Sequence, residues 1–478
     1  MLVDSASAAR TALKNSQLTD GESHAIYGTG HLRRRVEAAL ETLLFANCLG
    51  LAPITPANGA SPALGEYLPI VYEVPRNGQV RQMAVRQLAD VNEKFKRRDF
   101  DGVIADCDKA ISIDPTFSLA YYARGAAKHR KHLLDTALED LDHAIRLDPK
   151  FAPAYIDRAW VRLDQYDFDQ AISDCNVALK LSPKSPAAYN DRGVARREEG
   201  EVNAAINDFD QAIALDPGYE LAYRNRAAAE IQKGDLDAAT ADSTHAIELD
   251  PKDAVACVER GMAKSRRGDF AGALTDYDRA LQINPKYSGV YVARGAAKRD
   301  RGDLEGALVE YNQALQVDPK NTFALRHLGV TKELKGDFNG ALSELIRAAE
   351  LAPPSRFNDY DQFFIWVLRA RLNQRDEADT RLGQYLEDRT QPLLEPWIAN
   401  IGKFLLGKLA ESDFIASANA TDPDEKLGQL CEAWYYAGMK RLLSGDKQGG
   451  LDGLRHCTET KKTGFFEYTL AEAELARS

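Results

Sequence analysis

Residues Ser288 to Asn321 read SGVYVARGAAKRDRGDLEGALVEYNQALQVDPKN, two short stretches with helical apolar spacing that are separated by Gly302-Asp303 and closed by Asp318-Pro319. The same pattern recurs on both sides, and a proline ends each copy at a constant step of 34 residues. These prolines are Pro115, Pro149, Pro183, Pro217, Pro251, Pro285, Pro319 and Pro353. A fixed period of this length predicts a solenoid of stacked helix hairpins.

Columns of small residues follow the same period. With residue 84 as position 1, position 8 holds glycine or alanine in every copy after the first, and position 27 holds alanine throughout. Small residues let the two helices approach closely, and a larger side chain would overpack the seam at a cost of roughly 1–3 kcal/mol. Position 24 supplies larger or softer core residues, such as Phe209, Tyr277 and Tyr311. The columns therefore predict tightly packed antiparallel hairpins.

At these columns, residues 84–353 closely resemble the tetratricopeptide repeat (TPR) family, in eight copies without insertion. The resemblance implies an all-α fold, a right-handed TPR superhelical solenoid of antiparallel helix hairpins. It also implies a concave groove that grips peptides or partner helices. Gly200, Gly234, Gly268, Gly302 and Gly336 fall at the expected end of the first helix, where a left-handed cap favours glycine.

After Pro353 the strict period fails, but helical patterning continues through residues 354–478. We expect a degenerate TPR-like hairpin over 359–390, a helix over 395–406, a second hairpin around the Gly445-Asp446 turn, and a last helix over 465–475. That last helix would form a C-terminal cap, because a solenoid must cover the apolar face of its final repeat.

Three segments of this region also resemble the C-terminal part of NlpI-type bacterial TPR lipoproteins: FLLGKL at 404–409 after Trp397, AWYYAGM at 433–439 and FFEY at 465–468. Those proteins act in the cell envelope as adaptors for peptidoglycan hydrolases and a processing protease. The present chain differs from them in its more regular repeats and in lacking a clear lipoprotein signal. The resemblance implies a bacterial protein of the periplasm or cell envelope; without processing of an N-terminal signal, a cytoplasmic location is expected.

Residues 1–83 lie outside the repeat and are expected to form an N-terminal helix and a proline-rich linker, partly disordered. Arg33 to Arg35, an apolar run over 40–52 and a small, proline-rich stretch follow one another as in a secretory signal. The alternative is an amphipathic helix followed by a linker, which Glu37 and Glu41 favour. Cys48 occupies a place where a lipid-modified cysteine could stand, although Asn47 is a poor preceding residue.

Composition narrows the function classes. The net charge of −11 argues against nucleic acid as a partner, which would need a basic stripe. No run of about 18 uncharged apolar residues is present, so we expect no integral membrane segment.

The residues that could carry chemistry are scattered. None of the six cysteines forms a CxxC pair, which excludes the usual zinc and redox motifs, and Cys107 and Cys175 are expected to be buried apolar fillers. His129 and His132 lie one turn apart and could share a metal, but solvent-facing histidines are favoured because no carboxylate completes the set. We therefore expect no catalytic residue, no metal site and no cofactor, and a protein that is not an enzyme.

Two polar columns run through the repeats. Position 7 holds arginine in six successive copies, and position 23 is acidic in all eight. The arginines could form an anion-binding strip, or each could pair with a carboxylate on a neighbouring helix. Structural pairing is favoured, because a partner peptide rarely presents a charge at every repeat.

In TPR proteins, positions 2, 5, 9 and 12 of the first helix face the concave side, so the resemblance places the binding groove there. Here those columns mix aromatic, aliphatic, Arg and Asn side chains, which suits an extended peptide or an amphipathic helix. The candidate partner-binding residues are Tyr122, Trp160, Asn190, Arg197, Arg224, Arg299 and Arg326. Trp160 is either the anchor of the interface or a filler between helices, since aromatic residues dominate binding hot spots and also fill cores.

The sequence thus predicts a non-enzymatic scaffold or adaptor that binds a peptide or helix of a protein partner in the concave TPR groove. An alternative is a regulatory subunit that controls a separately encoded envelope hydrolase or protease, and a weaker third interpretation is an enzyme in its own right. The oligomeric state stays open.

Overall fold

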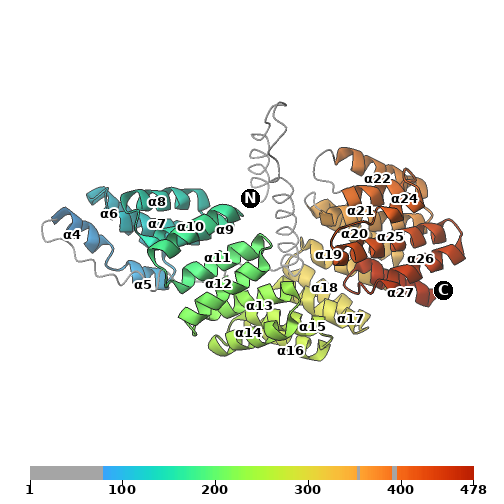
Figure 1. Cartoon of the computed structure of the whole chain (residues 1–478), viewed down its shortest axis with the longest axis horizontal. Coiled ribbons are helices and arrows are strands. Elements are labelled where there is room, and N and C mark those ends of the chain that lie inside the picture. Colours follow the sequence, from blue (N-terminus) through green and yellow to red (C-terminus); the bar gives the residue numbers. More distant parts are fainter. Residues whose placement is uncertain (1–78, 353–355, 390–395) are drawn as a thin grey trace.

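The computed structural model describes residues 79–352, 356–389 and 396–478, and within these ranges it contains helices and no strand. Helix follows helix along an arc in Figure 1, from α4 at the blue end through α16 to α22 and α27 at the red end. The expectations for residues 1–78, including the signal-like stretch and Cys48, lie outside the described residues.

The eight repeats form consecutive antiparallel hairpins. Their helices are α4 (Gln79–Gln87), α5 (Val91–Lys96) and α6 (Phe100–Ile113); α7 (Ser118–Arg130) and α8 (Leu134–Leu147); α9 (Ala152–Asp164) and α10 (Phe168–Leu181); α11 (Pro186–Glu198) and α12 (Val202–Leu215); α13 (Glu220–Lys233) and α14 (Leu236–Leu249); α15 (Ala254–Arg266) and α16 (Phe270–Ile283); α17 (Ser288–Asp300) and α18 (Leu304–Val317); α19 (Thr322–Leu334) and α20 (Phe338–Leu351). The first repeat differs from the others, because residues 88–90 form a turn that divides its first helix into α4 and α5. The predicted helical solenoid is confirmed.

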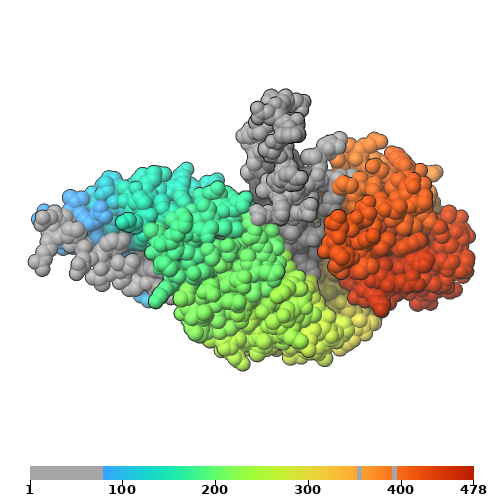
Figure 2. Space-filling model, in the orientation of Figure 1, coloured from blue at the N-terminus to red at the C-terminus, as the bar shows by residue number. Residues whose placement is uncertain are grey.

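The C-terminal region is helical as expected. Its helices are α21 (Arg356–Arg371), α22 (Arg375–Asp388), α23 (Pro396–Leu405), α24 (Glu411–Ala416), α25 (Pro423–Leu443), α26 (Lys447–Glu459) and α27 (Phe466–Arg477). The short helix α24 was not expected from the sequence. The side chains of these helices share one apolar core with repeat 8, which includes Val330, Trp366 and Tyr436. In the space-filling view the same helices form a rounded mass at the red end of the arc (Figure 2).

The turn after each second helix explains the recurring Asp-Pro. The residue before proline is extended, as at Asp114 with φ −135° and ψ 92°, because proline disfavours a helical predecessor. The Asp114 carboxylate then accepts a hydrogen bond of 2.9 Å from the backbone N–H of Thr116. From one repeat to the next, four residues of fixed geometry separate the end of the second helix from the start of the following helix, which keeps the 34-residue step constant.

The turn inside each hairpin uses a left-handed residue at position 15. Gly302, for example, has φ 90°, where a side chain would be strained. The next residue, Asp303, accepts a hydrogen bond of 2.9 Å from the N–H of Gly306 and so caps the second helix. Repeats 1 to 3 adopt the same left-handed turn without glycine, at Arg98, His132 and Tyr166.

Side-chain size is matched across each hairpin. A Cβ added to Gly295 would stand 2.5 Å from a ring carbon of Tyr311, sixteen residues further along the chain. The equivalent distances are 2.6 Å for Gly193 against Phe209 and 2.6 Å for Gly261 against Tyr277. Where alanine replaces this glycine, the residue sixteen positions on is small; these pairs are Ala159 with Cys175 and Ala227 with Ser243. Gly193, Gly261 and Gly295 are therefore required by the rings that face them.

The curvature follows from unequal packing of the two helices. The first helices of consecutive repeats contact one another; for example, α11 contacts α13, and α13 contacts α15. Each first helix also packs on the second helix of its own repeat. Within the described repeats, consecutive second helices make no comparable contact. The first helices therefore lie on the inner side of the arc and the second helices on its outer side.

The size matching gives a testable prediction. Gly295→Ala should lower the thermal unfolding midpoint, because the added methyl group overlaps the Tyr311 ring, at a cost of roughly 1–3 kcal/mol. In a Tyr311→Cys background, which reproduces the pairing of repeat 3, the same Gly295→Ala change should cost little. Thermal denaturation of the four proteins measures this coupling, and an equal loss in both backgrounds would contradict the size-matching argument.

Candidate functional site

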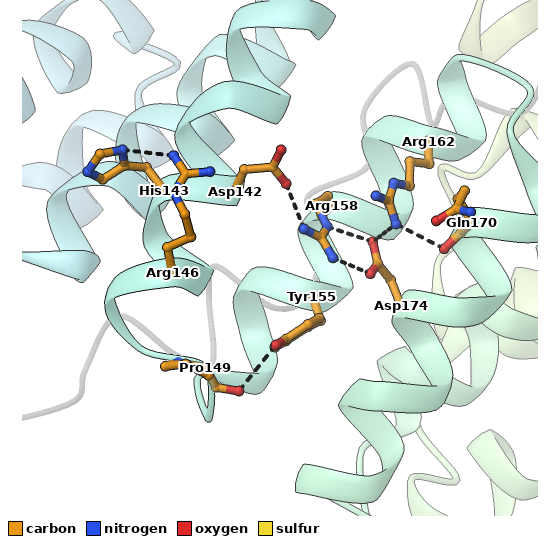
Figure 3. Close-up of polar contacts among 9 residues, drawn as sticks. All are labelled: Asp142, His143, Arg146, Pro149, Tyr155, Arg158, Arg162, Gln170 and Asp174. Atoms are coloured by element: carbon orange, nitrogen blue, oxygen red, sulfur yellow. Dashed lines mark hydrogen bonds and ion pairs between the residues drawn. The ribbon is translucent and has the colours of Figure 1, made fainter.

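The arginine column at position 7 joins each hairpin to its predecessor. Arg158 donates from Nε and Nη2 to the two carboxylate oxygens of Asp174 at 2.8 and 2.6 Å, and from Nη1 to Asp142 at 2.6 Å (Figure 3). Asp174 lies sixteen residues ahead, in the same repeat, whereas Asp142 lies sixteen residues behind, in the preceding repeat. The guanidinium therefore bridges α8, α9 and α10.

This bridge recurs along the array. Each of the other arginines of the column also donates both to the position-23 acid of its own repeat and to a polar residue of the preceding one. These sets are Arg124 with Asp140 and Asp108, Arg192 with Asp208 and Asn176, Arg226 with Asp242 and Asp210, Arg260 with Asp276 and Thr244, and Arg294 with Glu310 and Asp278. The predicted structural pairing is confirmed, and the guanidinium groups are already occupied by the scaffold.

A second cation reaches the same carboxylates from position 11, which sequence reasoning missed. Arg162 contacts Asp174 at 2.6 Å and Lys264 contacts Asp276 at 2.8 Å. The other repeats use Lys94, Lys128, Arg196, Lys298 and Lys332 in the same way. Repeat 5 is the exception, since it carries Glu230 there.

Glu230 thus places a second carboxylate where the other seven repeats place a cation. Its side chain is buried, and Oε2 has no hydrogen-bond partner in the described structure. Burial and the negative charge of Asp242 raise the pKa of Glu230 to about 8. The positive charge of Arg226 lowers this pKa but offsets the increase only in part. Repeat 5 therefore carries an electrostatic defect.

The predicted groove residues of repeats 2 and 3 lie in the packed interior of the inner helices. Tyr122 on α7 is fully buried, with its ring edge-to-face on Phe151 at 5.0 Å between centroids. Trp160 on α9 is only 8% exposed and belongs to the apolar cluster around Cys175 and Phe209. Of the two interpretations of Trp160, this packing favours the filler.

Side chains of repeats 4 and 5 form a row of hydrogen bonds that links two amides and one carboxylate. Asn190 on α11 donates to Asp191 at 3.1 Å and accepts from Nδ2 of Asn225 on α13 at 2.9 Å. Burial raises the pKa of Asp191 well above its ordinary value, and the negative charge of Asp157 adds to this effect. The amide of Asn225 keeps an open acceptor, because its Oδ1 has no hydrogen-bond partner among the described side chains.

The next inner helices add charged groups. Arg224 on α13 contacts Asp253 at 3.1 Å, and Arg197 on α11 contacts Glu198 at 2.6 Å. Glu259 on α15 is 3% exposed, and its Oε2 is without a hydrogen-bond partner in the described ranges. Burial raises the pKa of Glu259 to about 8, while Arg224 and Arg197 act in the opposite direction.

We call these residues the inner polar strip: Asp157, Asp191, Asn225 and Glu259 at position 6, with Asn190 and Arg224 at position 5. Of the predicted site residues, only Asn190 and Arg224 belong to it, and Arg197 lies beside it. The sequence signal for the rest was the position-6 column itself, which is polar without interruption only in repeats 3 to 6. Our sequence reasoning did not use that column.

Arg299 and Arg326 are engaged by the chain itself. Arg326 makes a bidentate pair with Asp361 of α21, at 2.5 and 2.6 Å, and both side chains are buried. Arg299 contacts Nδ1 of His327 at 3.1 Å and lies under the Phe466 ring of α27, 5.4 Å from its centroid. The described guanidinium contacts of these two arginines are thus intramolecular, and their role in partner binding stays a prediction.

The expectation that His129 faces solvent was wrong. Its side chain is 15% exposed, and Nε2 lies 2.8 Å from the Asp164 carboxylate of the following repeat. His132, by contrast, is exposed at its turn. Across the described ranges, no group of three or more His, Cys, Asp or Glu side chains is placed to hold a metal ion.

Family models match two parts of the chain: a tetratricopeptide repeat model over residues 190–254 and a TPR repeat model over residues 295–336. The chain therefore carries tetratricopeptide repeats, a fold that commonly serves as a protein-interaction scaffold. No curated protein matches the sequence.

Several solved structures are similar in fold. A TPR protein from Parabacteroides merdae is 19% identical, with 52% of this chain and 99% of that chain covered and a TM-score of 0.43. The Cut9–Hcn1 complex of APC/C is 19% identical, over 68% of this chain and 62% of that chain, with a TM-score of 0.47. YrrB, described as a TPR protein with an unusual peptide-binding site, is 19% identical over 39% of this chain and 95% of that chain, with a TM-score of 0.32. The resemblance to NlpI-type proteins has no counterpart in these comparisons.

Removal of one bridging arginine should destabilise the array. Arg192→Ala leaves the buried carboxylate of Asp208 with a single cation, so we expect a loss of about 2 kcal/mol, seen as a lower thermal midpoint, with partner binding nearly unchanged. The control is Arg301→Ala, because Arg301 is half-exposed and its ion pair measures 4.0 Å. A large loss of affinity at unchanged stability would show that the column binds a partner instead.

Repair of the repeat-5 defect should stabilise the protein. Glu230→Lys restores the cation that faces Asp242, and we expect a gain of about 1 kcal/mol. The same change at the exposed Glu139, an acid of α8 outside the paired columns, is the matched control and should have little effect.

The defect also has a pH signature. Because folding raises the pKa of Glu230 from its ordinary value of 4.5 to about 8, the folded state binds a proton more tightly than the unfolded state. The stabilisation from this proton is present below pH 4.5 and is lost as the pH rises to 8. Thermal midpoints measured across this range should therefore fall less steeply for Glu230→Gln than for the wild type, and parallel curves would contradict the assignment.

Proposed function

We propose that the protein is a non-enzymatic scaffold that holds an extended peptide or a helix of a partner protein along the inner helices of repeats 3 to 6. One observation carries this proposal. Polar atoms that are buried and lack hydrogen-bond partners in the described structure are found on three successive inner helices. They are Nη1 of Arg197, Nε of Arg224, Oδ1 of Asn225 and Oε2 of Glu259.

Such atoms are costly, because a buried polar group without a partner costs about 1–3 kcal/mol. Because neighbouring side chains cover these atoms, a polypeptide reaches them only when those side chains move; its backbone N–H can then donate to an amide oxygen and its C=O can accept from a guanidinium. A lysine or arginine side chain would also complement Glu259, because a nearby cation favours the charged carboxylate against the burial that raises its pKa. The inner polar strip therefore supports recognition of a polar, partly cationic segment better than recognition of a purely apolar one.

The comparisons support the class of function but not the partner. The matched TPR models belong to a fold commonly used for protein interaction, and YrrB is a TPR protein for which a peptide-binding site is described. The alternative proposal, that the protein controls a separately encoded envelope hydrolase or protease, rests on the resemblance of its C-terminal region to NlpI-type proteins. Assay of a captured enzyme separates the two roles, because an adaptor changes where the enzyme acts and a regulator changes its rate.

Selection from a peptide library tests the proposed groove. Peptides that bind the purified wild type should lose roughly tenfold in affinity when Asn225→Ala removes one buried hydrogen-bonding group, or when Glu259→Gln removes the carboxylate that a cationic residue would meet. The thermal midpoint of each variant is recorded in parallel, so that a folding defect is recognised. Arg301→Ala, whose side chain is about half exposed, serves as the control and should bind normally. Equal binding by all four proteins, or no selected peptide, would contradict the proposal.

A further inference from the structure

Two cysteines of the C-terminal region lie in contact. Cys431 on α25 and Cys457 on α26 have their sulfur atoms 3.4 Å apart, and both side chains are fully buried. The other cysteines of the described ranges, Cys107, Cys175 and Cys257, are also buried but have no sulfur neighbour within contact distance. This pair leaves no mark in the sequence, because the two residues are 26 positions apart and form no CxxC motif.

The helices around the pair hold it in place. Helices α25 and α26 form a tightly packed hairpin, and α27 covers it. The sulfur of Cys457 lies 3.8 Å from the backbone oxygen of Glu467 in the first turn of α27. Next to Glu467, the Phe466 ring contacts His327 of repeat 8 at 5.1 Å between centroids. The dithiol thus lies under α27, the helix that contacts α19 of the last repeat.

We propose that Cys431 and Cys457 form a reversible disulfide and constitute a redox-modification site of this protein. The sulfur atoms need to move from 3.4 Å to about 2.0 Å for the bond to form. This site is independent of the proposed peptide groove, which lies on repeats 3 to 6.

A peroxide is the oxidant of suitable chemical class. The thiol of Cys431 gives up its proton, the thiolate attacks one peroxide oxygen, and the O–O bond breaks. The leaving hydroxide takes up that proton and departs as water, and the sulfur becomes a sulfenic acid. The Cys457 sulfur then attacks the sulfenic sulfur, so that the S–S bond forms and a second water leaves. Each thiol loses one electron and one proton, and the peroxide is reduced to water. A small dithiol returns both cysteines to thiols by exchange.

Polar groups next to the pair favour a thiolate at Cys431. The hydrogen bond from the Cys457 thiol lowers the pKa of Cys431, and the hydroxyl of Thr460 and the ammonium of Lys462 act in the same direction, against burial and the charge of Glu432. The pKa of Cys457 is raised, first by its hydrogen bond to Cys431 and then by burial. The Thr460 hydroxyl and the Lys462 ammonium thus favour a thiolate at Cys431, which is the form that reacts with a peroxide.

Native oxidation followed by mass mapping tests the site. The folded wild type is treated with hydrogen peroxide, and remaining thiols are alkylated in denaturant before proteolysis. We expect a peptide that links Cys431 to Cys457, while Cys107, Cys175 and Cys257 are recovered alkylated. The link closes a long loop, so the thermal midpoint should rise by about 5 °C and return to its starting value after reduction.

Two variants control the experiment. Cys457→Ser should abolish both the linked peptide and the rise in the midpoint, whereas Cys175→Ser, which changes a buried cysteine without a sulfur neighbour, should retain both. The mass mapping needs only the wild type and so does not depend on whether the variants fold. Recovery of Cys431 and Cys457 as alkylated thiols, a link to another cysteine, or a link that forms only in denaturant would overturn the proposal.

Discussion

The structure depends on the guanidinium bridge that ties each of repeats 2 to 7 to the hairpin before it. Arg158 illustrates the constraint, because its partners Asp142 and Asp174 lie the same number of residues before and after it, on two different hairpins. Asp174 is almost completely buried, so its negative charge has to be compensated by cations that are held at a fixed distance. An inserted residue between the partners would displace one of them and leave a buried carboxylate unpaired, which typically costs several kcal/mol. The bridge thus accounts for the absence of insertions from the repeats that it joins, the first to the seventh.

Much of this arrangement could be predicted from the sequence because it repeats. The spacing of Arg192 and Asp208, seen again in neighbouring copies, was sufficient to predict their pairing, and the glycine column was sufficient to predict close helix packing. The ring that requires Gly295 also stands in the sequence, at Tyr311, but its role becomes visible only when the two columns are compared pair by pair. The turn that divides α4 from α5 could not be predicted, since a single non-repeating copy carries no internal comparison.

The candidate site was harder to predict for a related reason. Arg326 has the position of a groove residue, yet its guanidinium is held by Asp361 of α21, in a region where the period has ended. Contacts between segments far apart in sequence leave no mark in the spacing, which is also why the pairing of Cys431 with Cys457 was missed. Glu259 was missed for a different reason. It lies in the polar position-6 column, which is adjacent to the family's usual groove positions but is not one of them.

Repeat 5 departs from its neighbours twice, and both departures weaken the same hairpin. Glu230 opposes Asp242 where a cation stands elsewhere, and Ser243 fills the core position with a hydroxyl that bonds back to Ala239 at 2.8 Å instead of with a ring. In a linear array each unit is held mainly by its neighbours, so one weak unit limits how far cooperativity extends. If the array were stretched along the arc, the hairpin of α13 and α14 would unfold before the other repeats. The repeats on either side would then remain folded as two rigid segments joined by a flexible connection.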